Sequence, residues 1–200
     1  MESIQQPCPC FSFSVRAARL TDLNDLADLL VQSFHSQTGV WSLMMPLFRL
    51  GIYEDLKYRL KSDNDHYVCF VAINGSDNGS DLSNSQVIGG VEMALRSRDF
   101  WQPIAKQQPY LSNLAVRAEY RQRGVAQRLL RASEHCALDW GFQDLYLHVL
   151  EDNKQARRLY QKAGYRVQRF ESGLLSWLAG RPRQILLHKH LVSPQNHSDS

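Results

Sequence analysis

The stretch Leu111-Ser-Asn-Leu-Ala-Val-Arg-Ala-Glu-Tyr-Arg-Gln-Arg-Gly-Val-Ala126 predicts a strand that passes through a short turn into a helix. The turn is Arg121-Gln-Arg-Gly-Val-Ala126. The first N–H groups of a helix have no partner inside the helix, and the helix dipole adds partial positive charge at the same place. Gly124 lets the backbone approach a ligand, and Ala126 keeps the wall small. The stretch therefore predicts a binding site for a pyrophosphate.

A second stretch continues the same alternation of strand and helix. It runs Leu145-Tyr-Leu-His-Val-Leu-Glu-Asp-Asn-Lys-Gln-Ala-Arg-Arg-Leu-Tyr-Gln-Lys-Ala-Gly-Tyr165. Asn153 belongs to a residue type that caps helices, and Gly164 stands where a helix would end in left-handed backbone. Gly141 has the same relation to the helix that follows Gly124.

Together the two stretches resemble the core of the GNAT superfamily of N-acetyltransferases. That family binds acetyl-CoA with Arg or Gln, two residues, Gly, one residue and then Gly or Ala, a pattern that Arg121, Gly124 and Ala126 match. The turn has neither the Lys-Ser/Thr of a P-loop nor the Gly-x-Gly-x-x-Gly of a dinucleotide fold. The second motif of the family, a helix-opening Asn, a Tyr seven residues later, then Gly and an aromatic, is matched by Asn153, Tyr160, Gly164 and Tyr165. The resemblance covers residues 85 to 170.

Periodicity and turn residues divide the whole chain into elements. Strands are predicted at Phe11–Ala17, His66–Ile73, Val87–Leu95, Tyr110–Val116, Asp144–Val149, Tyr165–Leu174 and Gln184–Leu191. Helices are predicted after Thr21, which can cap the first of them, and at Leu47–Leu60, Gly124–Trp140 and Asn153–Ala163, with a polar loop at Asn74–Gln86. We expect one α/β domain over residues 11–192, a flexible N-terminus at 1–10 and a disordered tail at 193–200. The resemblance implies a mixed, mostly antiparallel sheet of six to seven strands, with helices on both faces and a splayed central strand pair.

The resemblance also implies which residues hold the cofactor. The backbone of the strand before the turn would bond the pantetheine arm, and Tyr160 would stand beside the cofactor sulfur and protonate the departing thiolate. Tyr160 also fits simple packing of its helix on the sheet, and Asn153 also fits a helix cap. The expected cofactor-binding residues are Leu114, Ala115, Val116, Arg121, Gln122, Arg123, Gly124, Val125, Ala126, Asn153 and Tyr160.

Two residues compete for the role of general base. A lone His on an apolar strand is more often a core residue, but His148 matches the place where one branch of GNAT N-terminal acetyltransferases carries a His base. In that branch a tyrosine ten residues before the aromatic of the turn completes a water-holding pair, and Tyr110 stands ten residues before Tyr120. Imidazole, with a reference pKa near 6.5, suits proton removal from an amine at neutral pH. Glu92, which also reads as an exposed strand carboxylate, is the rival base.

Composition restricts the partners of the chain. Its net charge of +3 falls far short of the basic face that nucleic acid binding needs, so no nucleic acid partner is expected. Of the four cysteines, Cys69 and Cys136 lie in apolar segments, and the Cys8–Cys10 pair has no second pair at metal-ligand spacing. No metal site is therefore expected. Since the sequence shows neither a secretory signal nor an apolar run of about 20 residues, we expect a cytoplasmic protein with no membrane partner.

The resemblance implies an enzyme that transfers an acetyl group from acetyl-CoA to a primary amine by direct attack in a ternary complex. Ser112-Asn113 before Leu114, and the closing run from Gln184 to Leu191, resemble GNAT proteins of cyanobacteria and chloroplasts, which acetylate lysines and protein N-termini. The expected substrates are thus protein N-terminal α-amines and/or lysine ε-amines, for a monomer or homodimer. Two alternatives stay open: acetylation of a small amine such as a polyamine, amino acid or drug, and a regulatory module that binds acyl-CoA without turnover.

Overall fold

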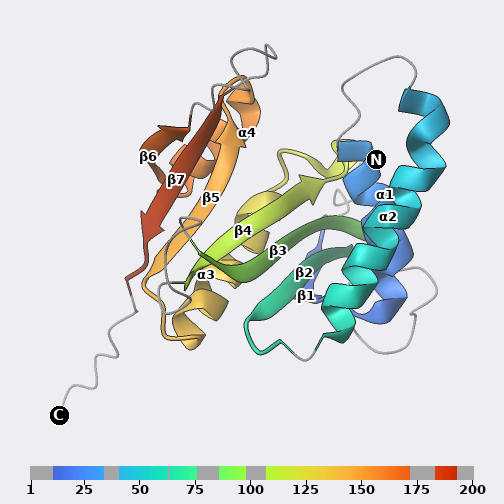
Figure 1. Cartoon of the computed structure of the whole chain (residues 1–200), viewed down its shortest axis with the longest axis horizontal. Helices are drawn as coiled ribbons and strands as arrows, with labels where there is room; N and C mark the ends of the chain where they lie inside the picture. Colours follow the sequence, from blue (N-terminus) through green and yellow to red (C-terminus); the bar gives the residue numbers. More distant parts are fainter. Residues whose placement is uncertain are drawn as a thin grey trace, which may run out of the picture.

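Seven strands form one mixed sheet in the order β1-β2-β3-β4-β5-β7-β6 (Figure 1). The computed structural model describes residues 11–33, 41–62, 64–75, 86–97, 107–171 and 183–192. Neighbouring strands are antiparallel except β4 and β5, which run parallel. The strands are β1 Phe13–Ala17, β2 Tyr67–Asn74, β3 Val87–Ser97, β4 Gln107–Val116, β5 Asp144–Leu150, β6 Arg166–Glu171 and β7 Gln184–His190. The predicted mixed, mostly antiparallel sheet is confirmed.

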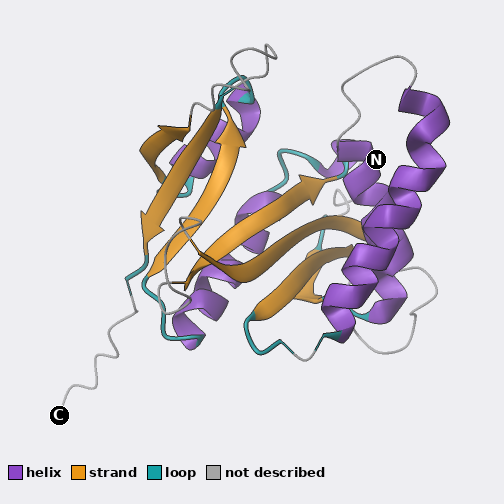
Figure 2. Ribbon diagram, viewed as in Figure 1, coloured by secondary structure: helices purple, strands orange, loops and turns teal. Residues whose placement is uncertain are grey.

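Helices cover both faces of this sheet (Figure 2). Helices α1 Leu23–Ser33 and α2 Trp41–Lys61 pack on one face, and α3 Val125–Asp139 and α4 Lys154–Lys162 pack on the other. Side chains along a strand alternate between these layers, so on β2 Val71 joins the core under α1 and α2 while Ala72 joins the core under α3. The sheet is thus buried from both sides where α1 and α3 cross it.

The helix ends follow local residue chemistry. Gly141 and Gly164 adopt positive φ angles of 84° and 92°, which confirms the predicted stops of α3 and α4. The Asn153 side chain accepts a hydrogen bond of 3.0 Å from the Ala156 N–H, so it caps α4 as expected. The prediction for Thr21 was wrong: it lies inside the 3₁₀ turn Leu20–Asp22, and it is Asp22 that accepts the Arg19 N–H.

Other boundaries differ from expectation or fall outside the description. Helix α2 begins at Trp41, ahead of the predicted start at Leu47. The predicted loop between β2 and β3 has its ends joined by a 3.0 Å hydrogen bond from the Asn74 N–H to the Gln86 carbonyl, while residues 76–85 lie outside the described residues. Residues 1–10 and 193–200 also lie outside them, so the flexible start, the disordered tail and the 11–192 domain limits stay predictions.

Candidate active site

The parallel pair β4 and β5 separates soon after it forms. The two strands pair at Tyr110–Tyr146 and Leu111–Leu147, whereas on its other edge β5 pairs with β7 along its whole length. Figure 1 shows β4 and β5 diverging toward their carboxyl ends. The backbone of β4 from residue 112 to 116 therefore faces an opening on its β5 side, and the predicted splayed pair is present.

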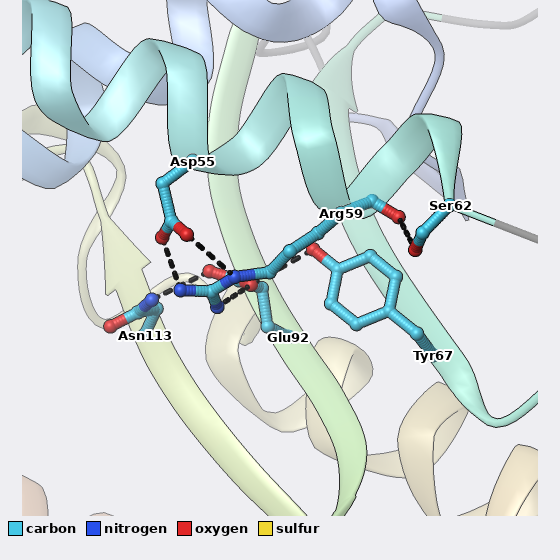
Figure 3. Close-up of polar contacts among 6 residues, drawn as sticks. All are labelled: Asp55, Arg59, Ser62, Tyr67, Glu92 and Asn113. Carbon is cyan, nitrogen blue, oxygen red and sulfur yellow. Dashed lines mark hydrogen bonds and ion pairs between the residues drawn. The ribbon is translucent and has the colours of Figure 1, made fainter. Parts of the chain in front are cut away.

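An irregularity in β4 accompanies this separation. The register of β3 against β4 shifts between Gly90 and Glu92, and Asn113 takes a positive φ of 54°, which marks a β-bulge. Asn113 donates a 2.6 Å hydrogen bond from its side-chain amide to Glu92, which is only 2% exposed. The same carboxylate accepts hydrogen bonds from Arg59 on α2 (2.8 Å) and from the Tyr67 hydroxyl on β2 (2.9 Å), as Figure 3 shows. Glu92 thus ties the bulge to two other elements.

A large cavity of about 920 Å³ lies between the carboxyl end of β4 and the starts of α3 and α4. Its wall includes the turn before α3, where Gln122 and Gly124 both adopt positive φ angles, of 61° and 82°. Apart from the adjoining backbone, no atom of the described residues lies within 4 Å of the place where a Cβ on Gly124 would stand, so the backbone there is uncovered. None of the described residues that line the cavity carries a carboxylate. Four of them are basic: Arg121, Lys154, Arg158 and Lys162. Free helix amides and cations suit a ligand with phosphates.

A second, smaller cavity of about 180 Å³ lies where β4 and β5 still pair. Tyr110 and His148 both line it, and the Tyr110 hydroxyl lies 2.6 Å from His148 Nδ1. The other ring nitrogen, Nε2, is buried and lies 3.0 Å from a carboxylate oxygen of Glu171 on β6. Arg96 on β3 covers the Tyr110 ring, with its guanidinium carbon 4.6 Å from the ring centre.

Comparison with known proteins now decides the family. Residues 28–165 match the model of the acetyltransferase (GNAT) family. The chain belongs to the GNAT family.

Individual relatives agree with this assignment. The chain is 32% identical over 163 residues to GCN5-related N-acetyltransferase 10, chloroplastic, of Arabidopsis thaliana, covering 79% of this chain and 63% of that protein. It is 33% identical over 81 residues to thialysine N-epsilon-acetyltransferase of Bos taurus, covering 36% of this chain and 48% of that one. The crystal structure of Paia N-acetyltransferase from Thermoplasma acidophilum in complex with coenzyme A shares the fold, with a TM-score of 0.66 at 17% identity over 90% of this chain and 99% of that one.

Acetyl-CoA is the co-substrate of the GNAT family, and the larger cavity fits it. The structure brings ten of the eleven expected cofactor residues to this one cavity. They are Leu114, Ala115, Val116, Arg121, Gln122, Gly124, Val125, Ala126, Asn153 and Tyr160. Arg123 is the exception, because its guanidinium turns away and lies 5.0 Å from the Phe11 ring centre and 5.8 Å from that of Tyr120. A role of Arg123 in holding phosphates is therefore not supported by its side chain.

Tyr160, on α4, is the candidate proton donor. It lines the larger cavity and is 8% exposed, and its ring packs edge-on against Tyr165. Burial, together with the neighbouring Tyr110, raises the pKa of Tyr160 to about 12. The phenol therefore keeps its proton at neutral pH, as a general acid must. Both expected features of Tyr160, packing and access to the cofactor site, are present.

The two candidate bases differ sharply in surroundings. Glu92 lines neither cavity, and its carboxylate is buried and already accepts from three protein donors, so it does not face a substrate in either cavity. Because Glu92 is buried, the interpretation of Glu92 as an exposed strand carboxylate was wrong. His148 lines the smaller cavity. The Tyr110 hydroxyl makes a direct hydrogen bond with its ring rather than a contact through a water. A 2.6 Å separation leaves no room for a water between them.

Sequence reasoning missed Glu171, which completes the surroundings of His148. Glu171 ends β6, and β7 separates that strand from β5 in the sheet. No motif contains it, and no local spacing links it to His148, so only the three-dimensional arrangement reveals the contact.

Two further findings concern the described residues only. Among them, no group of three or more His, Cys, Asp or Glu side chains is arranged to hold a metal ion. None of the described helices is both long and apolar enough to cross a membrane.

Proposed function

We propose that this chain transfers the acetyl group of acetyl-CoA to a primary amine of a protein, either an N-terminal α-amine or a lysine ε-amine. The observation that carries the proposal is that β4 lines two cavities, a small one with Tyr110 and His148 where β4 pairs with β5, and a large one beyond the point where that pairing ends. Bound acetyl-CoA supplies an activated thioester. The chain spans 63% of its Arabidopsis relative, so the activity of the whole protein is part of this proposal.

The residues divide the chemistry between them. His148, through Tyr110, accepts a proton from the attacking amine in the smaller cavity. Among residues 114 to 116, the backbone N–H groups that point to the free edge of β4 orient the ligand and can stabilise developing negative charge on a carbonyl oxygen. Tyr160, protonated because of its raised pKa, donates a proton on the sulfur side.

Direct attack within a ternary complex is supported by the placement of the described cysteines. Cys69 packs in the core under α1 and α2, and Cys136 lies on α3, so neither lines a cavity. Burial raises the pKa of both thiols, which disfavours the nucleophilic thiolate. A covalent acetyl-cysteine intermediate at either residue is therefore not part of the proposal.

A small amine is the second candidate substrate. It is favoured by the similarity to thialysine N-epsilon-acetyltransferase of Bos taurus, whose name gives thialysine as its substrate. A site for a polyamine would need acidic residues, and among the described residues that line the smaller cavity one is an acid, Glu171, beside the basic Arg96. The cytoplasmic location and the monomer or homodimer state stay proposals, and the Arabidopsis relative is named as chloroplastic.

The test is release of the free CoA thiol on adding amines to protein and acetyl-CoA. We expect release with peptides that carry a free N-terminus or an internal lysine, and much less with spermidine. Peptides blocked at one of the two amines separate the α-amine from the ε-amine. Release with spermidine or free amino acids alone would transfer the assignment to a small-molecule enzyme, and binding of acetyl-CoA without any release would indicate the regulatory module.

A further inference from the structure

Both ring nitrogens of His148 face protein groups. Nδ1 lies 2.6 Å from the Tyr110 hydroxyl oxygen. The buried Nε2 lies 3.0 Å from Glu171 Oε2, a charged-pair contact whose angles fall short of a hydrogen bond. On β7, Leu186 pairs with His148 in the sheet and adds an apolar wall to the cavity. A substrate amine therefore cannot contact either nitrogen of the imidazole without displacing a protein group.

The contact with Glu171 determines which nitrogen carries the hydrogen. Burial alone would raise the pKa of the Glu171 carboxyl, but its contacts with Arg169 and His148 lower it below the ordinary value. Glu171 is then ionised, and a lone pair on Nε2 would face a negative carboxylate oxygen 3.0 Å away, so Nε2 must carry the hydrogen. Nδ1 consequently presents its lone pair, and the Tyr110 hydroxyl donates to it. Arg169 holds the other carboxylate oxygen of Glu171 at 2.7 Å, which fixes the orientation of the group.

Tyr110 offers a hydrogen-bond acceptor to an amine in the smaller cavity. It lines the smaller cavity, and after donating its hydrogen to Nδ1 its oxygen still has a lone pair that can accept from an amine. Burial raises the pKa of Tyr110 although nearby Arg96 and His148 lower it, so the phenol is neutral at neutral pH. The other titratable groups nearby are Tyr146, which lines the same cavity, and Tyr160 on α4.

We propose that Tyr110, His148 and Glu171 form one proton relay in which Tyr110 meets the amine and Glu171 is a positioning residue that fixes the tautomer of His148. The inference rests on the proposed function. An N–H bond of the amine breaks, its electron pair stays on nitrogen, and the proton forms a new O–H bond at Tyr110. The original Tyr110 proton moves at the same time to Nδ1 of His148. Tyr110 ends neutral, and the imidazolium faces the Glu171 carboxylate until it releases the proton to solvent.

The first test needs neither cofactor nor turnover. Nitrogen-15 NMR of the free protein reports the tautomer of each histidine, and the His148 signals are assigned by their loss in His148→Gln. We expect the Nε2–H form in the wild type, a shift toward the Nδ1–H form or a mixture in Glu171→Gln, and retention of the wild-type form in Glu171→Asp. Glu54→Gln, which removes an exposed carboxylate on α2, is the matched control and should leave the spectrum unchanged. A wild-type tautomer in Glu171→Gln would overturn the role of Glu171.

The second test compares kcat with KM. We expect Glu171→Gln to lower kcat by about 10- to 100-fold, part of the usual contribution of general base catalysis, with the KM for acetyl-CoA unchanged. Glu171→Asp should recover part of the loss, and Glu54→Gln should match the wild type. Because the relay acts as a unit, Tyr110→Phe should cost as much as His148→Ala, and the double variant no more.

The outcomes distinguish the two proposals. A loss below about 5-fold in Tyr110→Phe, with a full loss in His148→Ala, would overturn the relay while leaving the acetyltransferase assignment intact. Absence of transfer by the wild type would overturn the proposed function, and the NMR result would still decide whether Glu171 positions His148. Thermal unfolding of every variant separates these effects from loss of the fold.

Discussion

Replacement of Glu92 by Gln separates a structural carboxylate from a catalytic one. In the wild type one Glu92 oxygen accepts from Arg59 and Tyr67, and the other accepts from Asn113. A Gln can keep its oxygen toward the first two, and Asn113 can turn its own amide to accept from the new NH₂ group. What is lost is the charge-assisted part of these bonds, about 1–2 kcal/mol. For a chain of this size that lowers Tm by about 2–8 °C.

Activity should respond much less than stability. We expect kcat of Glu92→Gln, measured well below its Tm, to stay within about 10-fold of the wild type because the β4 bulge is kept. Glu92→Ala leaves the Tyr67 hydroxyl and the Asn113 amide buried without an acceptor, so it should cost about 3–5 kcal/mol. His148→Ala should instead lose about 10²–10⁴ in kcat with little change in acetyl-CoA affinity. A Glu92→Gln variant with wild-type Tm and lost turnover, beside an active His148→Ala, would refute this reasoning and make Glu92 the base.

Three further predictions concern other parts of the chain. Gly124→Glu places a side chain on left-handed backbone and a carboxylate beside the expected phosphates. Calorimetry should therefore detect no acetyl-CoA binding by a folded variant. Unchanged affinity would show that the turn is not part of the cofactor site. Tyr160→Phe removes a phenol whose pKa is about 12, so transfer should slow by up to about 10²–10⁴-fold, less if the thiolate leaves readily; single-turnover rates at wild-type level would show that no acid is needed there. Burial alone would raise the pKa of Asp22, but hydrogen bonds from Arg16 and from the Arg19 N–H lower it. The ionised carboxylate therefore stabilises the fold at pH values above its unfolded pKa, which is near 3.9. This stabilisation is lost as the pH falls through the lower folded pKa. Asp22→Asn should therefore lower stability toward urea at pH 7, and its difference from the wild type should shrink as pH falls through the lowered folded pKa of Asp22. A difference that does not change with pH would contradict the assignment.

Features of the structure could be predicted from the sequence where the interacting residues are close together along the chain. The turn at Gly124, the cap at Asn153 and the left-handed end at Gly164 are set by neighbours within a few positions, and the structure has the cap and both positive φ angles. The seven strands follow from local alternation and turn residues, so they too were predicted, with ends that move by a few residues.

The contacts around the two acids were not predictable in the same way. The partners of Glu92 lie 21 to 33 residues away on three other elements, so its alternation within β3 suggested exposure where the fold buries it. Glu171 meets His148 across two strands of the sheet, since β7 lies between β5 and β6, so no local pattern in the sequence points to the contact. Arg123 belongs to the cofactor motif by spacing, but aromatic rings at Phe11 and Tyr120 attract its guanidinium elsewhere.

The early end of β4–β5 pairing links the stability of this protein to its supply of acetyl-CoA. From residue 112 onward β4 has hydrogen-bonding groups on one edge that no strand of the sheet takes up, and a ligand with amide groups along an extended arm is able to fill that place. Such a ligand binds the folded chain but not the unfolded one. At a concentration one hundred times its Kd it would add about 2.7 kcal/mol to the free energy of unfolding. Metabolic state would then influence how long each molecule of this protein survives proteolysis, as well as how fast it works.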